Sequence, residues 1–144
     1  MKNYYCLGTS DSQNKIAIDI LKIRLEEKKY PLYQKTPFLH EVKKEDEVIF
    51  YIAGKNTFSQ NFFGSAIIEN TENTEKETVD PDKNKHVVIK NLILRSINIF
   101  KTPIPIKLHI KELEFIKNKN NYGISLMGGV SKITENDFNL LTKS

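Results

Sequence analysis

The sequence predicts an α+β fold, in which a mixed, mainly antiparallel sheet curls into a barrel and carries helices early in the chain and at its end. Short runs of β-branched and aromatic residues alternate with turn signals through most of the chain. Residues 16–25 instead repeat their apolar side chains at helical spacing. Near the end, Thr134 and Asp137 precede another apolar stretch with the spacing of a helix cap. Together these patterns favour one sheet with two flanking helices.

The strands of the first half can be placed by their apolar runs. Residues 4–7 form a short apolar and aromatic run that stops at Gly8, and residues 47–52 are continuously β-branched and aromatic, typical of a central strand. The chain turns at residues 53–56 and returns over residues 62–69, which predicts a hairpin with a longish loop. Gly64 interrupts this returning strand and indicates a bulge or a close approach by another segment.

The early helix should be capped by Asp11 or Ser12. It should end before Pro31, because the residue that precedes a proline avoids the helical region. Residues 30–37 are then expected to form an ordered loop.

The second half of the chain is less regular. Residues 70–85 contain almost no apolar side chain, which predicts a solvated surface insertion within a single domain, residues 1–144. Residues 86–95 regain strand character, and two prolines within residues 97–106 confine pairing there to a short or edge strand. Residues 124–127 predict a last short strand.

Composition limits the class of protein. The 144 residues are 39% hydrophobic and 28% charged, which is ordinary for one soluble globular domain. The single cysteine, Cys6, cannot form an internal disulfide and is expected to be a small core residue. Because the sequence shows neither a signal-peptide core nor an apolar run of membrane-spanning length, we expect a cytoplasmic protein with no membrane partner. The sequence does not determine the oligomeric state, for which a monomer is favoured.

The net charge of +4 is unevenly distributed. Residues 1–65 carry 10 basic and 8 acidic side chains (+2), residues 66–85 carry 3 and 6 (−3), and residues 86–144 carry 9 and 4 (+5). The C-terminal part is therefore a candidate phosphate-facing surface. The alternative is that its lysines serve only to keep the protein soluble.

The sequence lacks recognisable motifs for catalysis. Its three histidines are isolated and have no Cys/His ligand spacing, so we expect no metal. It contains no phosphate-binding Gly-rich loop and no Gly-x-Ser-x-Gly nucleophile elbow. Glu45, Asp46 and Glu47 are explained by a polar turn before a strand. We therefore expect a binding protein that uses no cofactor and is not an enzyme.

The last third of the chain combines apolar anchors, glycines and lysines. It contains Leu113-Glu114-Phe115-Ile116-Lys117-Asn118-Lys119, then Tyr122-Gly123, then Leu126-Met127-Gly128-Gly129-Val130, and finally Asp137-Phe138. None of these residues is a nucleophile or a paired acid. The stretch therefore favours a ligand-binding surface.

Three patches of the sequence resemble a known family when they are taken together. Residues Tyr4-Tyr5-Cys6-Leu7-Gly8-Thr9-Ser10-Asp11-Ser12-Gln13-Asn14 are similar to the opening of YTH domains. Asp46-Glu47-Val48-Ile49-Phe50-Tyr51 and Phe62-Phe63-Gly64-Ser65-Ala66 resemble a signature shared by YTH and EVE domains, and the C-terminal stretch is most similar to the prokaryotic EVE branch of the PUA-like superfamily. The resemblance implies a small PUA-like pseudobarrel with flanking helices, and a pocket for a modified or flipped base of RNA or DNA.

The resemblance also places the pocket on particular residues. The tryptophan that forms one wall of the YTH cage would fall on Tyr30, with Tyr33 as the alternative, in a chain that has no tryptophan. Tyrosine offers a smaller stacking face than indole, so a stacking pocket fits this chain better than a cage for a methylated base. The residues implied for the ligand are Thr9, Ser10, Asn14, Tyr30, Tyr33, Phe63, Leu126 and Gly128, and those implied for phosphates are Lys117, Lys119 and Lys132.

The leading interpretation is a domain that binds nucleic acid as its partner. Two alternatives use the same features. The pocket could serve a small-molecule or anion sensor, or the domain could be an accessory module that contacts a protein of a modification or restriction system.

Overall fold

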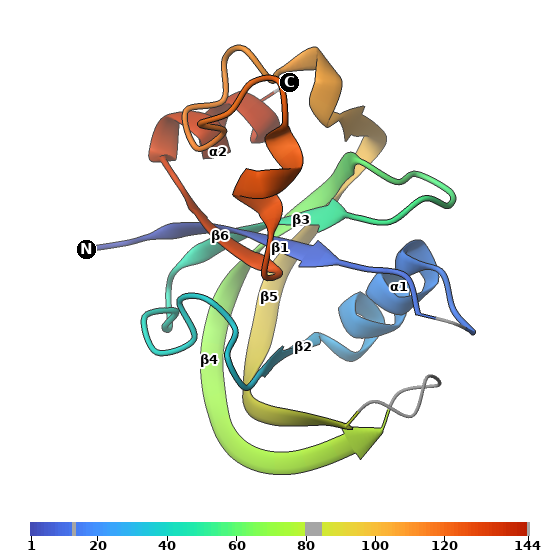
Figure 1. Ribbon diagram of the computed structural model, residues 1–144. Coiled ribbons are helices and arrows are strands. Elements are labelled where there is room, and N and C mark those ends of the chain that lie inside the picture. Colours follow the sequence, from blue (N-terminus) through green and yellow to red (C-terminus); the bar gives the residue numbers. More distant parts are fainter. Residues whose placement is uncertain (13, 80–84, 144) are drawn as a thin grey trace.

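The computed structural model describes residues 1–12, 14–79 and 85–143 (Figure 1). The elements are β1 (Tyr4–Thr9), α1 (Ala17–Glu27), β2 (Lys29–Tyr33), β3 (Glu47–Ile52), β4 (Asn61–Val79), β5 (Lys85–Pro105), the 3₁₀ helices η1 (Ile106–Leu108) and η2 (Tyr122–Leu126), β6 (Val130–Ile133) and α2 (Glu135–Thr142).

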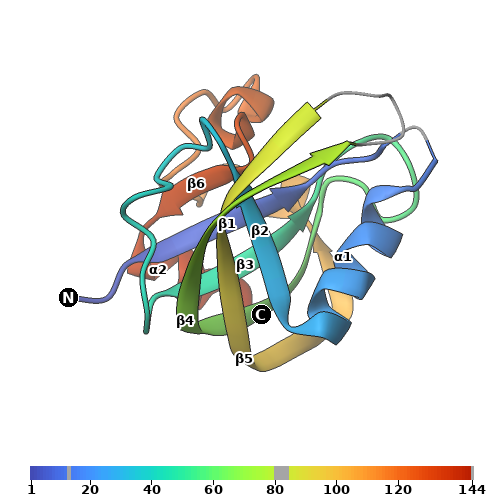
Figure 2. The same cartoon turned by 90° about the horizontal axis from the view of Figure 1, so that it is seen from below.

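One sheet joins the strands of the described residues in the order β2-β5-β4-β3-β1-β6. Strands β1 and β3 run parallel, while β2–β5, β3–β4, β4–β5 and β1–β6 pair antiparallel. The long strands β4 and β5 bend strongly and pass beneath β1 and β3 in Figure 1; Figure 2 views this bend from below. The sheet therefore curls into a half barrel. The predicted α+β fold with a mixed, mainly antiparallel sheet is confirmed.

The sheet carries a hydrophobic core on each face. Side chains alternate across a strand, so Tyr5 and Leu7 of β1 point to one face and Cys6 points to the other. The first face is covered by α1, whose Leu21 is fully buried there. The second is covered by α2 through Phe138. Cys6 is 1% exposed, which agrees with the expected core role.

Helix α1 begins later than the capping residues suggested. Its N-cap position is Ile16, which makes no side-chain cap, but the Asp11 carboxylate accepts a hydrogen bond from the Ala17 N–H at 2.8 Å. Asp11 therefore satisfies a free N–H of the first turn from six residues upstream. The helix ends at Lys28, which adopts the left-handed conformation with φ 56°.

The loop expected over residues 30–37 is wrong in its first part, because Lys29–Tyr33 form strand β2. Tyr30 and Leu32 are buried on alternate positions, and β2 pairs with β5. Pro31 is tolerated here because β2 lies at the edge of the sheet.

The loop expected over residues 70–85 is also corrected. Strand β4 continues to Val79 and remains paired with β5, for example Thr71 with Leu92 and Val79 with Lys85. Backbone pairing does not require apolar side chains, so polar composition alone did not reveal this extension. Residues 80–84 of the expected insertion lie outside the described residues.

The prolines of β5 occupy an edge, as the sequence indicated. Strand β2 pairs only with residues 88–93 of β5. Pro103 and Pro105 lie beyond this part, where β5 is paired with β4 on one side and with no described strand on the other. At the C-terminus, Thr134 Oγ1 accepts a hydrogen bond from the Asp137 N–H at 3.0 Å, which confirms the predicted cap of α2.

The strand expected over residues 124–127 is wrong. Residues 124–126 belong to η2, Met127 is its C-cap, and the last strand is β6. The chain turns at Gly128 and Gly129, whose φ angles are 89° and 87°, so it can pair with β1 only after these glycines.

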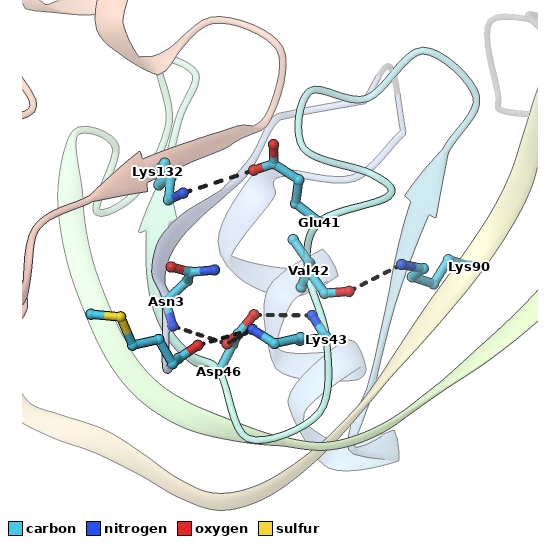
Figure 3. Close-up of polar contacts among 8 residues, drawn as sticks. Asn3, Glu41, Val42, Lys43, Asp46, Lys90 and Lys132 are labelled. Atoms are coloured by element: carbon cyan, nitrogen blue, oxygen red, sulfur yellow. Dashed lines mark hydrogen bonds and ion pairs between the residues drawn. The ribbon is translucent and has the colours of Figure 1, made fainter.

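Two buried polar groups hold the segment before β3 (Figure 3). The fully buried Asp46 carboxylate accepts hydrogen bonds from the Asn3 N–H and the Lys43 N–H, each at 3.0 Å. The Lys90 ammonium donates to the Leu39 and Val42 carbonyls at 2.7 and 3.0 Å. Burial lowers the pKa of Lys90.

Gly64 lies against the backbone of β5, which confirms the expected close approach. A Cβ at position 64 would lie 2.5 Å from the Asn98 carbonyl oxygen, and the pairing of β4 with β5 shifts register beside it. The contact is with backbone, so a side chain here cannot be relieved by rotamer changes.

We predict that Gly64→Ala lowers the free energy of unfolding by about 1–3 kcal/mol, because the two strands must move apart. Gly123→Ala is the matched control, since the nearest atom to its added Cβ would be Asn121 Oδ1 at 3.7 Å. Urea denaturation measures both. Equal losses in the two variants would contradict the close approach as the cause.

Candidate ligand-binding site

Two adjoining cavities lie at the C-terminal end of β1 and share Gly8, Ser10, Gly128 and Gly129. The first, the aromatic cavity, has a volume of about 320 Å³ and is lined also by Tyr51, Gln60, Tyr122, Leu126 and Met127. The second, the arginine cavity, has a volume of about 510 Å³ and is lined also by Asp11, Arg24, Tyr30, Tyr33 and Thr36. Both volumes fall in the range of small-ligand pockets.

The parallel pairing of β1 with β3 creates this location. Thr9 and Ile52 are partners in the register, so the chain leaves both strands at the same edge of the sheet. The segment before β6 joins them, because the Gly8 N–H donates to the Gly129 carbonyl at 2.7 Å. Three segments that are distant in sequence therefore meet at one point.

Asp11 ties two of these segments together. Its Oδ1 accepts from the Ala17 N–H, and its Oδ2 accepts from the Lys55 N–H at 3.0 Å and from Asn56 Nδ2 at 2.9 Å. The hydrogen bonds from the Lys55 and Ala17 N–H groups lower the pKa of Asp11. Gly54 has φ +91°, and a Cβ there would lie 2.2 Å from Asp11 Oδ2, so a glycine is needed beside the carboxylate.

In the arginine cavity, a guanidinium lies on a tyrosine ring. Arg24 Cζ is 4.6 Å from the centroid of Tyr30, within cation–π range. Arg24 Nη2 donates to the Tyr33 hydroxyl at 3.3 Å, and Nη1 contacts Thr9 Oγ1 at 3.5 Å. Phe50 packs near the same tyrosine with its ring centroid at 6.0 Å.

Tyr30 is consequently more a supporting residue than an open stacking face. Its side chain is 3% exposed, and its hydroxyl donates to the Gly8 carbonyl at 3.0 Å and lies 3.0 Å from Thr9 Oγ1. Burial raises its pKa. The ring of Tyr30 packs against the Arg24 guanidinium, and its hydroxyl holds the end of β1.

The aromatic cavity has a different chemistry. The Tyr122 hydroxyl donates a hydrogen bond to Gln60 Oε1 and so joins η2 to the β3–β4 loop. Tyr51 packs against Phe62 with ring centroids 5.3 Å apart, and burial raises its pKa. Met127 stands at the rim and is 70% exposed.

The structure brings together five of the eight residues implied for the ligand. Ser10, Tyr30, Tyr33 and Gly128 line the arginine cavity, and Leu126 lines the aromatic cavity together with Ser10 and Gly128. The other three lie elsewhere. Thr9 is buried behind the cavity wall, Phe63 lies in the core beneath the sheet, and Asn14 is exposed outside both linings.

The three lysines implied for phosphates line neither cavity. Lys119 Nζ donates to the Leu113 carbonyl at 2.6 Å. Lys132 Nζ lies 3.9 Å from Glu41 Oε2, as Figure 3 shows. Lys117 is exposed on the same segment as Lys119.

Sequence reasoning missed Arg24, Asp11 as a clamp, and the Tyr51–Tyr122 side of the site. One signal was present for the first of these. Arg24 and Arg95 are the two arginines among the 22 basic residues of the chain, and an arginine in a lysine-rich sequence marks a position that needs a planar, multiply bonding cation. The partners of Asp11 and Tyr122 depend on loops that meet through the fold, and no local pattern shows them.

Comparison with known proteins identifies the family. The model of the EVE domain family matches residues 7–144, so this chain belongs to the EVE domain family, as the resemblance implied. A search of curated proteins found no match.

Solved structures share the fold over nearly the whole chain. Protein Atu2648 from Agrobacterium tumefaciens is 16% identical with a TM-score of 0.55, covering 98% of this chain and 91% of its own. The N-terminal domain of Staphylothermus marinus McrB is 11% identical with a TM-score of 0.55, and the match covers 99% of this chain and 94% of that domain. Human THYN1, solved in complex with DNA that contains 5-methylcytosine, is 14% identical with a TM-score of 0.53, covering 99% and 96%. At these identities the likeness shows the fold, a PUA-like pseudobarrel.

Two features are absent from the described residues. Within them, no helix has both the length and the apolar character needed to cross a membrane. The same residues contain no group of three or more His, Cys, Asp or Glu side chains placed to hold a metal ion.

We predict that the Asp11 clamp makes stability depend on pH. The pKa of Asp11 is lowered in the folded protein, so the ionised carboxylate stabilises the fold. This stabilisation is complete above the ordinary pKa of 3.8, and it is lost as the pH falls through the lowered pKa of the folded state. Asp11→Asn should therefore have a lower Tm than the wild type at pH 7, and the gap should narrow below about pH 4. Asp19→Asn, exposed on α1, is the control. A gap that stays constant from pH 7 to pH 3 would rule out the charge as its cause.

Proposed function

We propose that this EVE domain is a non-enzymatic nucleic-acid-binding module, which receives one modified or flipped base in the two adjoining cavities. The observation that carries the proposal is the pair of cavities itself. In one place the fold presents aromatic rings, a guanidinium and backbone polar groups, in a volume suited to a base.

The chemistry of the cavities matches what an unstacked base requires. Removing a base from its stack costs a few kcal/mol, which stacking and edge hydrogen bonds must offset. Tyr33 and Tyr122 contribute aromatic surface, and Ser10 together with the Gly128–Gly129 backbone contributes polar groups. The guanidinium of Arg24, held on Tyr30, is a further flat surface on which a base can stack.

The similar structures support a nucleic-acid partner at the level of the fold. Human THYN1 has the same fold and was solved with DNA that contains 5-methylcytosine. For this chain the lining favours a base that stacks and accepts hydrogen bonds over one held by a tryptophan cage, because Arg24 projects donors into the larger cavity.

A catalytic role is not supported by the nucleophile that the chain offers. Cys6 is buried, and burial raises the pKa of its thiol, so the reactive thiolate is disfavoured. We therefore propose recognition without chemistry. As a separate proposal, we place the protein in the cytoplasm.

We predict that a panel of modified nucleosides contains at least one that raises the Tm of the protein. For that nucleoside, Tyr33→Ala and Tyr122→Ala should each weaken binding by about 5- to 150-fold, because stacking contributes about 1–3 kcal/mol per base. Fluorescence titration measures the affinity. Phe58→Ala is the matched control, since Phe58 is 46% exposed and outside both linings.

The same experiment separates the alternatives. Nucleoside binding without any affinity for oligonucleotides would indicate a small-molecule sensor. The absence of binding to nucleosides and oligonucleotides alike would refute the proposed function and leave a protein-interaction module as the explanation.

A further inference from the structure

A third cavity, of about 340 Å³, lies on the far side of Arg24. It shares Ile20, Arg24, Pro31 and Tyr33 with the arginine cavity, so the two cavities adjoin each other between α1 and β2. These two elements lie side by side in Figures 1 and 2. We call the part beyond Arg24 the basic groove; its charged residues are Lys15, Arg24, Glu27 and Lys29.

The charge of the basic groove is positive. Three basic side chains face one acidic side chain there, which gives a balance of +2. Lys29 Nζ lies 3.6 Å from Glu72 Oε1, but both side chains are about half exposed, and such pairs are weak and easily exchanged. The ion pairs found among the described residues include neither Lys15 nor Arg24.

Arg24 lines both cavities and so lies where they adjoin. Among the described residues, Arg24 contacts the ring of Tyr30 and the hydroxyls of Thr9 and Tyr33, and none of these groups carries a negative charge. Two of its five N–H donors are used in these bonds, so donors remain for a ligand. A guanidinium held in place by a ring loses little side-chain entropy when it binds a phosphate.

The acidic side chain that lines the arginine cavity does not cancel the charge of Arg24. Asp11 also lines the arginine cavity, but both of its oxygens accept hydrogen bonds from the Ala17 N–H, the Lys55 N–H and Asn56. These donors offset its charge locally. The floor of the basic groove is apolar, with Ile20, Ile23 and Pro31, and suits the sugar that lies between two phosphates.

We propose that the basic groove is the path of the nucleic-acid backbone, with Arg24 binding the phosphate next to the captured base and Lys15 and Lys29 binding the next phosphates of a single strand. The inference rests on the proposed function of the two cavities. It takes the place of the C-terminal lysines as the phosphate contacts, because the basic groove adjoins the arginine cavity, whereas Lys117, Lys119 and Lys132 line none of these three cavities.

The first test uses the nucleoside that the panel identifies, its 5′- and 3′-monophosphates, and inorganic phosphate. One of the monophosphates should bind about tenfold more tightly than the nucleoside, and Arg24→Gln should abolish that advantage while nucleoside affinity falls less. Arg24→Lys, which keeps the charge but loses the planar fork, should retain part of it. Lys22→Gln, exposed on the same helix, is the control. Tm measurements show whether each variant is folded.

The second test follows the salt dependence of a single-stranded oligonucleotide that contains the same base. For single strands, the slope of log K against log salt changes by about 0.7 for each phosphate contact. The double variant Lys15→Gln/Lys29→Gln should therefore flatten the slope by about 1.4 and leave nucleoside affinity unchanged. Lys117→Gln/Lys119→Gln, which removes the same charge from the C-terminal segment, should leave the slope as it is.

The outcomes separate this inference from the proposed function. Two results would show that the backbone path is wrong while leaving the base site in place. In the first, the wild type binds nucleosides, but a phosphate on the nucleoside does not raise the affinity. In the second, the Lys117→Gln/Lys119→Gln variant changes the salt slope and the Lys15→Gln/Lys29→Gln variant does not. If the wild type binds none of the probes, both are wrong. Binding of inorganic phosphate alone, lost in Arg24→Gln, would show an anion site without a nucleotide and would also overturn the inference.

Discussion

The parallel pairing of β1 with β3 is the constraint on which the rest of the structure depends. Two buried or bonded carboxylates hold this pair at its opposite ends. Asp46 binds the Asn3 N–H where the strands begin, and Asp11 binds the Lys55 N–H where they end. Each carboxylate joins the chain around one strand to the chain around the other, so the loops that follow β1 and β3 are held together at the site.

A parallel pair also requires a long crossover, and the crossover supplies much of the site. Between β1 and β3 the chain forms α1, β2 and the segment fixed by Lys90 and Asp46. This route places Arg24 of α1 over Tyr30 of β2, next to the end of β1. The same residues thus close the core and form the wall shared by the arginine cavity and the basic groove.

Sequence patterns predicted the parts of the fold that depend on local order. The central strand, the hairpin to β4, the close approach at Gly64 and the cap at Thr134 each have a short-range signal, and each is found. The errors share a cause. The polar half of β4 and the edge strand β2 exist because a neighbouring strand offers backbone partners, which side-chain patterns do not report. Likewise, the chain turns at Gly128 and Gly129, so the last strand begins at Val130 and not at residue 124 as predicted.

By itself the sequence determined the class of the protein, an α+β domain of the EVE family, and its resemblance pointed to Ser10, Tyr33, Leu126 and Gly128, which line the two cavities. Only the tertiary structure decided which candidates face a cavity. It turned Tyr30 into the support of Arg24, placed Thr9 and Phe63 in buried positions, and brought Tyr122 beside Gln60. The physical reason is that local propensity and spacing follow the chain, whereas a cavity is made by segments that meet through sheet register, and register is set by pairing over long distances in sequence.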